Sequence, residues 1–200
     1  IIINVGRQLG SGGHDIGRML ALDFQAKYYD REILNLAAKE SGLSEKIFEQ
    51  NDEKKGFFRG LLNLGVPHLG GGEKSGITQE NLFQFQSEAI QKAAKEGSCV
   101  FVGRCADYVL RDFKNVVNIF ITASMGYRIE QIMNKQHLDY VAAQKFIEQK
   151  ESDRASYYNY YTGKKWGAAE SYDLCIDSSI LGFVETEKLI AEFIRKKFKI

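Results

Sequence analysis

The chain has 200 residues, a length that fits one compact domain. Hydrophobic residues make up 44% of it and charged residues 26%, which is typical of a globular protein and excludes generic disorder. Lys and Arg number 27 and Asp and Glu number 26, so the net charge of +1 argues against a protein that coats a nucleic acid polymer.

The apolar runs and the cysteines bear on where the protein works. No run approaches the ~18–20 apolar residues of a membrane span, so we expect no membrane contact. The first apolar run, Ile1–Val5, is too short for a secretory signal and has no basic flank before it. The three cysteines are an odd number without metal-ligand spacing, which predicts reduced thiols in a cytoplasmic enzyme.

Short apolar runs alternate with helical patterns along the chain. The predicted strands are Ile1–Val5, Tyr28–Tyr29, Cys99–Val102, Val116–Ile121 and Asp173–Ile176. The predicted helices cover 14–25, 31–39, a short stretch from 44, 78–95, 125–135, 138–157 and 185–197. Strands and helices in this order imply a parallel sheet covered on both faces. We therefore predict a three-layer α/β/α domain with about five parallel strands.

Residues 51–77 interrupt this alternation. They contain the only proline, Pro67, and a run of glycines at Gly70–Gly72. A long glycine-rich segment within a compact domain is usually functional or disordered, so we interpret it as a flexible insertion.

The glycine-rich segment Gly6–Gly13 lies between the first strand and the first helix. Glycine allows backbone conformations in which successive N–H groups converge on a phosphate, and the helix that follows adds its positive end. We favour a phosphate site over a connection without a ligand, because both flanking elements are present. His14 begins the helix, where it could contact the phosphate or remain an exposed polar residue.

This loop departs from the standard P-loop pattern G-x-x-x-x-G-K-S/T. With Gly12 at the last glycine, Gly13 stands at the lysine position and Arg7 at the first glycine. The dinucleotide pattern G-x-G-x-x-G also fails, because its third glycine falls on Asp15, so NAD binding is disfavoured. Phosphoryl transfer would need a cation from elsewhere in the chain.

Arginines provide the remaining candidates. Arg104 directly follows the buried strand Cys99–Val102, which aims it at the ligand crevice of a parallel sheet. A guanidinium matches a phosphate bidentately. Arg128 and Arg154 lie in predicted helices, where a single arginine is usually a solvated surface charge.

Several runs match a known family in order and in approximate spacing, from residue 1 to about 195. They are Gly10-Ser11-Gly12 (G-S-G), Gly103-Arg104 (G-R), Phe120-Ile121-Thr122-Ala123-Ser124 (F-L/I-T-A-S), Arg154-Ala155 (R-A) and Ile176-Asp177-Ser178 (I-D-S/T). The chain therefore resembles the cytidylate kinase-like proteins, a branch of the P-loop nucleoside-monophosphate kinases. It is closer still to a divergent branch that carries Tyr29–Glu32 (Y-D-K/R-E), Gly103–Asp107 (G-R-C-A-D) and Tyr157–Gly167 (Y-Y-x-Y-Y-T-G-x-x-W-G).

The resemblance implies ATP and Mg²⁺ as cofactors and nucleotides as substrates. It implies that Gly10, Ser11, Gly12 and Gly13, with His14 and Asp15, surround the donor phosphates. Arg104 would hold the acceptor monophosphate, and Arg128 and Arg154 would clamp the transferring group. We expect Arg7 or another lid cation to replace the missing lysine. Further candidates are Asp30, Arg31 and Asp107 for the acceptor, and Asp15 and Asp107 for Mg²⁺.

The resemblance also implies an organisation within one domain over 1–200, with an acceptor subdomain at about 43–95 and a lid at about 136–168. The tyrosines of 157–166 could pack the lid or stack on a base. The favoured activity is phosphoryl transfer from ATP to CMP or dCMP. A kinase of another small acceptor and a nucleotide-binding sensor without transfer activity remain alternatives, and the sequence predicts no oligomeric state.

Overall fold

The computed structural model describes residues 1–31 and 79–200. Within these ranges five strands form one parallel sheet in the order β2-β3-β1-β4-β5. The strands are β1 (Ile2–Arg7), β2 (Lys27–Tyr29), β3 (Cys99–Val102), β4 (Val116–Thr122) and β5 (Leu174–Asp177). This confirms the predicted α/β fold with a five-stranded parallel sheet.

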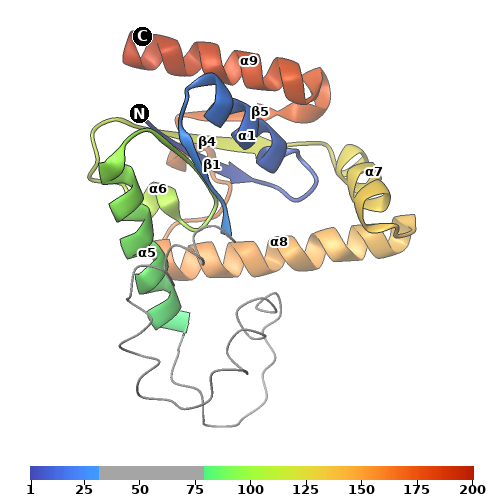
Figure 1. Ribbon diagram of the computed structural model, residues 1–200. Coiled ribbons are helices and arrows are strands. Elements are labelled where there is room, and N and C mark those ends of the chain that lie inside the picture. Colours follow the sequence, from blue (N-terminus) through green and yellow to red (C-terminus); the bar gives the residue numbers. More distant parts are fainter. Residues whose placement is uncertain (32–78) are drawn as a thin grey trace.

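Helices cover both faces of the sheet (Figure 1). Helix α1 (Gly13–Asp23) and helix α9 (Ser178–Phe198) lie on one face. Helix α5 (Gln79–Glu96) and the short α6 (Ala106–Val109) lie on the other, where α8 (Tyr140–Thr162) runs across the molecule. Helix α7 (Met125–Gln136) precedes α8, and a 3₁₀ turn (Ala169–Ser171) leads into β5. Of the helix predicted over 31–39 only Arg31 is described, and the helix predicted from 44 and the insertion 51–77 lie outside the described residues.

Two helices differ from their predicted bounds by more than two residues at one end. Helix α8 continues to Thr162, so most of the predicted aromatic lid segment is helical, and Gly163 ends it with a φ of 67°. Helix α9 begins seven residues before the predicted start, at Ser178, where the Asp177 side chain accepts a hydrogen bond from the Ser179 N–H. Its first turn is separated from the rest by Gly182, whose φ of 72° breaks the helical periodicity that the sequence pattern relies on.

The core has two halves because side chains alternate across a strand. On one face Ile3 and Val5 of β1 pack with apolar residues of α1 and α9, among them Leu20 and Ile190. On the other face Ile2 of β1 packs with β3, α5 and α6. Burial of each such side chain contributes about 1.5–3 kcal/mol, so the sheet gives the site a rigid base.

The connections place a crevice beside β1. The chain passes from β1 to β2 on one side, and after β3 it crosses to β4 on the opposite side of β1. Ligands of open parallel sheets bind where the connections diverge in this way, beyond the carboxyl ends of the strands. The loop after β1, the Gly103–Arg104 turn after β3 and the Thr122–Ser124 segment after β4 all meet at this edge.

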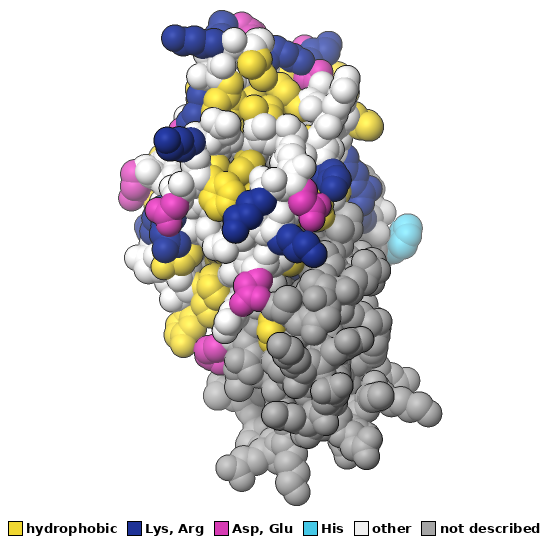
Figure 2. Space-filling view, turned by 60° about the vertical axis from the view of Figure 1, so that its left-hand side comes forward, with side chains coloured by type: hydrophobic (Ala, Val, Ile, Leu, Met, Phe, Trp, Pro, Cys, Tyr) yellow, Lys and Arg dark blue, Asp and Glu magenta, His cyan; other side chains and the backbone are white. Residues whose placement is uncertain are grey.

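The surface carries charges of both signs. Figure 2 shows Lys and Arg side chains interspersed with Asp and Glu over one face, in keeping with the net charge of +1. Across residues 1–31 and 79–200, no helix combines the length and the apolar character that a bilayer crossing requires.

Candidate functional site

The loop between β1 and α1 depends on two glycines with left-handed backbones, Gly10 at φ 82° and Gly12 at φ 76°. A Cβ on Gly10 would lie 2.7 Å from the carbonyl oxygen of Arg128. A Cβ on Gly12 would lie 2.2 Å from the ring of Phe183 in α9. Both positions therefore require glycine for their conformation and for the close approach of a neighbouring helix.

Ser11 anchors this loop to the sheet. It is fully buried, and its hydroxyl lies 2.9 Å from the carbonyl oxygen of Gln8 and 3.1 Å from that of Ile121 in β4. The hydroxyl of Ser178 donates to the Ser11 carbonyl at 2.7 Å. Because the Ser11 side chain is occupied inside the fold, only its backbone is available to a ligand.

Helix α1 begins beside this loop without a side-chain cap. Its N-cap is Gly12, and no side chain accepts a hydrogen bond from the first turn. The N–H groups of a first helical turn have no partner within the helix, and the helix dipole makes this end positive. The start of α1 is therefore suited to an anion.

A cavity of about 990 Å³ opens next to the loop. This volume is in the upper range of small-molecule sites. Its lining includes most of the predicted site residues: Arg7, Gly10, Gly12, Gly13, His14, Asp15, Arg31, Arg104, Asp107 and Arg154. Three predicted residues, Ser11, Asp30 and Arg128, are outside the lining, and all three are buried.

Three arginines from different elements converge on the cavity: Arg7 at the end of β1, Arg104 after β3 and Arg154 in α8. Burial, together with repulsion from Arg154 and Arg104, lowers the pKa of Arg7 to about 9. Burial and repulsion from Arg104 also lower the pKa of Arg154, although Glu151 opposes this change. A group of mutually repelling cations around a cavity favours an anionic ligand.

His14 lies against this group and is neutral. Burial, and then the charge of Arg7, lower the pKa of His14 to about 4. Its Nε2 lies 3.2 Å from a terminal nitrogen of Arg7 and its Nδ1 lies 3.1 Å from the hydroxyl of Tyr28. Arginine only donates hydrogen bonds, so Nε2 accepts from Arg7 and the ring proton is on Nδ1.

The turn after β3 holds Arg104 in a strained backbone. Gly103, Arg104 and Cys105 have successive φ values of 81°, 60° and 55°. The left-handed region costs about 1–3 kcal/mol for a residue other than glycine, and such strain is concentrated at functional sites. The guanidinium carbon of Arg104 lies 5.2 Å from the centre of the Tyr157 ring, which fixes its direction over α8.

Asp107 is buried beneath this turn. It accepts a hydrogen bond of 2.6 Å from the hydroxyl of Tyr158, and burial raises the pKa of its carboxyl group. Asp15 is exposed in the first turn of α1. No three His, Cys, Asp or Glu side chains in the described part of the chain are grouped as a metal site. A metal ion here would therefore take most of its ligands from a bound phosphate chain and from water.

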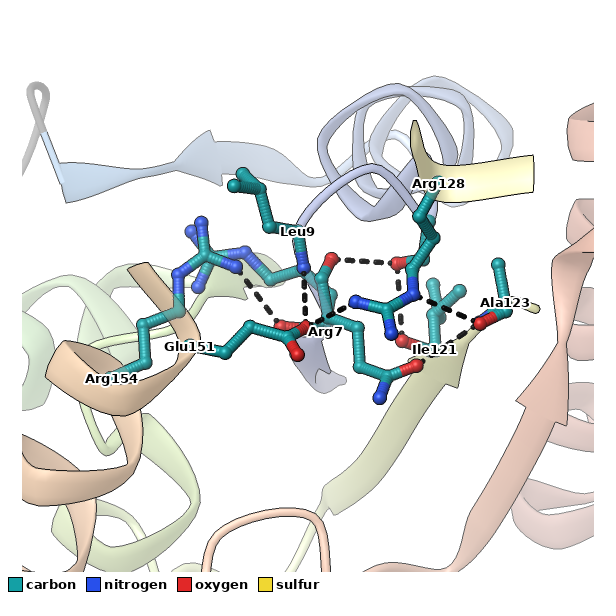
Figure 3. Close-up of polar contacts among 9 residues, drawn as sticks. Arg7, Leu9, Ile121, Ala123, Arg128, Glu151 and Arg154 are labelled. Atoms are coloured by element: carbon teal, nitrogen blue, oxygen red, sulfur yellow. Dashed lines mark hydrogen bonds and ion pairs between the residues drawn. The ribbon is translucent and has the colours of Figure 1, made fainter. Parts of the chain in front are cut away.

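Arg128 lies on the far side of the loop and is engaged in a buried ion pair (Figure 3). It contacts Oε1 of Glu151 at 2.6 Å and donates from Nε to the carbonyl of Ala123 at 3.0 Å. The same Glu151 oxygen accepts the backbone N–H of Leu9 at 3.2 Å. Arg154, one turn further along α8, donates to the carbonyl oxygen of Arg7 at 3.3 Å. Helix α8 thus holds the loop at two points.

Some residues of this site were not predicted as functional. Glu151 is one of them, because nothing in the sequence pairs it with Arg128 or with Leu9. Phe83 of α5 stacks on Tyr161 with 4.0 Å between the ring centres. Tyr158 and Tyr161 therefore pack within the fold, as one of the two predicted roles requires. Tyr157, Tyr160 and Tyr161 also line the cavity, so stacking on a ligand stays a prediction.

The protein has a P-loop kinase-like α/β fold. Three features define it: the parallel sheet, the glycine loop that precedes α1, and the arginines around the crevice. The sequence over residues 2–180 matches the model of the cytidylate kinase-like family, and the chain belongs to that family. No curated protein sequence matches it.

Solved structures agree with this assignment. An uncharacterised protein from Eubacterium ventriosum is 25% identical, with a TM-score of 0.75 over 97% of this chain and 98% of that one. A shikimate kinase from Bacteroides thetaiotaomicron is 12% identical, with a TM-score of 0.53 over 100% and 99% of the two chains. A gluconokinase from Sinorhizobium meliloti is 13% identical, with a TM-score of 0.52 over 98% and 94%. At these identities the two kinases support the fold alone.

Proposed function

We propose that the protein transfers a phosphoryl group from ATP to a small acceptor, and that CMP or dCMP is this acceptor. The observation that carries the proposal is the convergence of Arg7, Arg104 and Arg154 on one cavity beside a glycine loop. Family membership supports phosphoryl transfer in general, and the family's cytidylate kinase-like character favours the cytidine nucleotides.

Catalysis of this kind consists of positioning and charge neutralisation. In the proposed arrangement, backbone N–H groups of Gly10–Gly13 and the start of α1 bind the donor phosphates. Arg104 binds the acceptor phosphate, and Arg154 and Arg7 stabilise the charge of the transferring group. Arg128 is held by Glu151, so its direct contact with the transferring group requires that ion pair to open.

The proposed cofactors are ATP and Mg²⁺. Mg²⁺ would neutralise charge on the phosphate chain. Asp15 and Asp107 line the cavity and supply the carboxylate oxygens that this ion prefers. The Asp107 carboxylate accepts from the Tyr158 hydroxyl and interacts with the backbone N–H groups of Asp107 and Tyr108, so binding of Mg²⁺ would require it to give up some of these contacts.

The acceptor would bind near the carboxyl end of β2. Asp30 is buried there, and its charge raises the pKa of both Arg7 and His14 against the larger effects of burial and the other cations. Arg31 follows it and lines the cavity. Arg31, Arg104 and Asp107 line the cavity and offer both cations and an acceptor to a nucleoside monophosphate, whereas Asp30 lies outside the lining and acts through its charge.

An ATP/Mg²⁺ transfer assay against a panel of nucleoside monophosphates and small hydroxyl acceptors tests this function, with direct measurement of ATP binding alongside. We expect transfer to CMP or dCMP. Arg104→Ala should reduce kcat/KM by about 100-fold or more, because a charge-assisted contact in the transition state is lost. Arg111→Ala is the matched control, since Arg111 is about half-exposed and outside the cavity.

A nucleotide-binding sensor without transfer activity is the second candidate. The glycine at the lysine position of the loop favours it, because the usual cation is missing there. ATP binding without transfer to any acceptor in the panel would contradict the kinase proposal and favour the sensor.

A further inference from the structure

Two positions of the loop have exchanged their residue types. In the pattern G-x-x-x-x-G-K-S/T the first position is glycine and the seventh is lysine. Here the first is Arg7 and the seventh is Gly13. A Cβ on Gly13 would lie 2.5 Å from Cβ of Arg7 and 2.6 Å from its Cγ. The two positions share one space, so only one of them can carry a long side chain.

The side chain of Arg7 occupies this space and extends further. Its Nη1 would lie 2.2 Å from a Cβ on Gly103, so a second glycine, in the turn after β3, makes room for the guanidinium. The missing side chains of Gly13 and Gly103 thus leave space for Arg7 between the loop and the turn that carries Arg104. In this space the Arg7 guanidinium reaches the crevice between the loop and Arg104.

Arg7 is not held as a structural arginine usually is. Its Nε is enclosed and has no hydrogen-bond partner among the described residues. Within residues 1–31 and 79–200 it forms no ion pair, and its side chain hydrogen-bonds to the neutral His14. A buried cation that has no carboxylate in direct contact costs stability, although the charge of Asp30 offsets part of this cost. The remaining cost indicates a functional role.

His14 fixes the direction of this cation. Its Nε2 accepts from Arg7 at 3.2 Å, and its Nδ1 donates to the hydroxyl of Tyr28 at 3.1 Å. Both ring nitrogens are therefore occupied, which leaves none for a phosphate. Burial, followed by repulsion from Arg7 and smaller effects of Arg154 and Lys135, lowers the pKa of the His14 imidazole and keeps it neutral, while the charge of Asp30 acts in the opposite direction.

We propose that the cation of the phosphate loop has moved from position 13 to Arg7, where it binds the polyphosphate chain of a nucleoside triphosphate, and that His14 is a positioning residue that orients Arg7. This inference rests on the proposed function, because it concerns the donor side of the same site. The role of Arg7 deepens the sequence-based expectation that Arg7 replaces the missing lysine. The role of His14 differs from the sequence-based expectation, in which His14 itself contacts the phosphate.

The reciprocal exchange is the first test. Affinities for ATP and for inorganic tripolyphosphate are measured by calorimetry for the wild type, Arg7→Gly, Gly13→Lys and the double variant. Each single variant should lose about 10- to 100-fold, which corresponds to one charge-assisted hydrogen bond. Arg7→Gly removes the cation, and Gly13→Lys forces two side chains into one space. The double variant should recover to within about threefold of wild type, because it restores the standard pattern.

The Arg7→Met variant distinguishes loss of the cation from misfolding. Methionine fills the same space without charge, so the melting temperature should rise by about 2–4 °C while tripolyphosphate affinity falls at least tenfold. A purely structural Arg7 would instead give a lower melting temperature. Equal tripolyphosphate affinity in Arg7→Met and wild type would overturn the role of Arg7.

His14 is tested by a conservative pair. Glutamine retains a neutral acceptor for Arg7, so His14→Gln should keep tripolyphosphate affinity within about threefold, whereas His14→Leu should lose about tenfold. Equal losses in the two variants would contradict the positioning role.

The outcomes separate this inference from the proposed function. If the Arg7→Gly variant has normal tripolyphosphate affinity and still transfers phosphate to an acceptor, the inference is wrong and the proposed function stands. Loss of tripolyphosphate affinity in Arg7→Gly, with no transfer by the wild type to any acceptor, overturns the function and leaves the inference. A wild type that binds neither ATP nor tripolyphosphate contradicts both.

Discussion

One carboxylate oxygen of Glu151 joins three parts of the site. It accepts from Arg128 of α7 and from the N–H of Leu9 in the loop, while its own helix carries Arg154. The side chains of Arg128 and Glu151 are only 5% and 17% exposed, so little solvent screens the pair. This contact sets the distance between α8 and the loop.

Glu151→Gln should lower stability by about 1–3 kcal/mol, because it leaves the buried charge of Arg128 without its counter-charge while retaining an acceptor for Leu9. Thermal unfolding followed by circular dichroism measures this. Glu148→Gln is the control on an exposed position of the same helix and should change stability by less than about 0.5 kcal/mol. An unchanged melting temperature in Glu151→Gln would show that the ion pair contributes nothing.

Asp107 gives a prediction of pH dependence. Burial raises the pKa of its carboxyl above the ordinary value of 3.8, so at intermediate pH the folded state holds a proton that the unfolded state has lost. Stability from this group is present below pH 3.8 and is lost as the pH rises through the folded pKa. Asp107→Asn should therefore be more stable than wild type at pH 7, and the difference should shrink as the pH falls to 4. A difference that grows toward pH 4 would contradict this sign.

At the scale of the elements, the loop is constrained from both sides by helices. Phe183 of α9 covers Gly12, and the backbone of Arg128 in α7 covers Gly10.

Gly12→Ala should destabilise the protein by about 2 kcal/mol or more, because it combines a left-handed φ with a clash against Phe183. Gly126→Ala in α7 is the matched control. A Cβ there meets nothing within 4 Å, so stability should rise by about 0.5–1 kcal/mol. Urea unfolding midpoints compare the two variants.

Local sequence patterns predicted the strands and helices well where the spacing of apolar residues matches the side chains that the fold buries. The fully buried run Cys99–Val102 is predicted with its observed ends, and Val116–Ile121 differs from β4 by one residue. The start of α9 is missed because Gly182 interrupts the period, and the end of α8 is missed because tyrosines have only average helix propensity.

The sequence predicted which segments meet at the candidate site, but not which side chains contact one another there. The topology of a parallel sheet brings Gly10–Gly13 and Arg104 to one edge, and this follows from element order alone. The pairing of Glu151 with Leu9, 142 residues apart, and of Arg7 with His14 depends on how helices pack against the loop. No local pattern encodes such contacts.

At the scale of the whole molecule, the site is a concentration of positive charge in a chain of net charge +1. An anion bound there offsets repulsion among the arginines, so ligand binding and stability are coupled. Tripolyphosphate at about 100 times its Kd should stabilise the fold by about 2.7 kcal/mol and raise the melting temperature by about 5–10 °C. Differential scanning fluorimetry measures this shift, and added NaCl should reduce the affinity. A shift that does not depend on tripolyphosphate concentration would contradict a site for phosphate chains.

The contacts of α9 with the glycine loop have a consequence for synthesis of the chain. The loop leaves the ribosome before α9 does, yet Ser178 donates a hydrogen bond to the Ser11 carbonyl and Phe183 packs over Gly12. A growing chain that stops before Ser178 lacks both supports for the loop. Because domains emerge from their N-terminal end, the loop obtains its final shape only after α9 has been made and has docked. Binding of a ligand at the proposed phosphate site should therefore appear only after α9 has emerged.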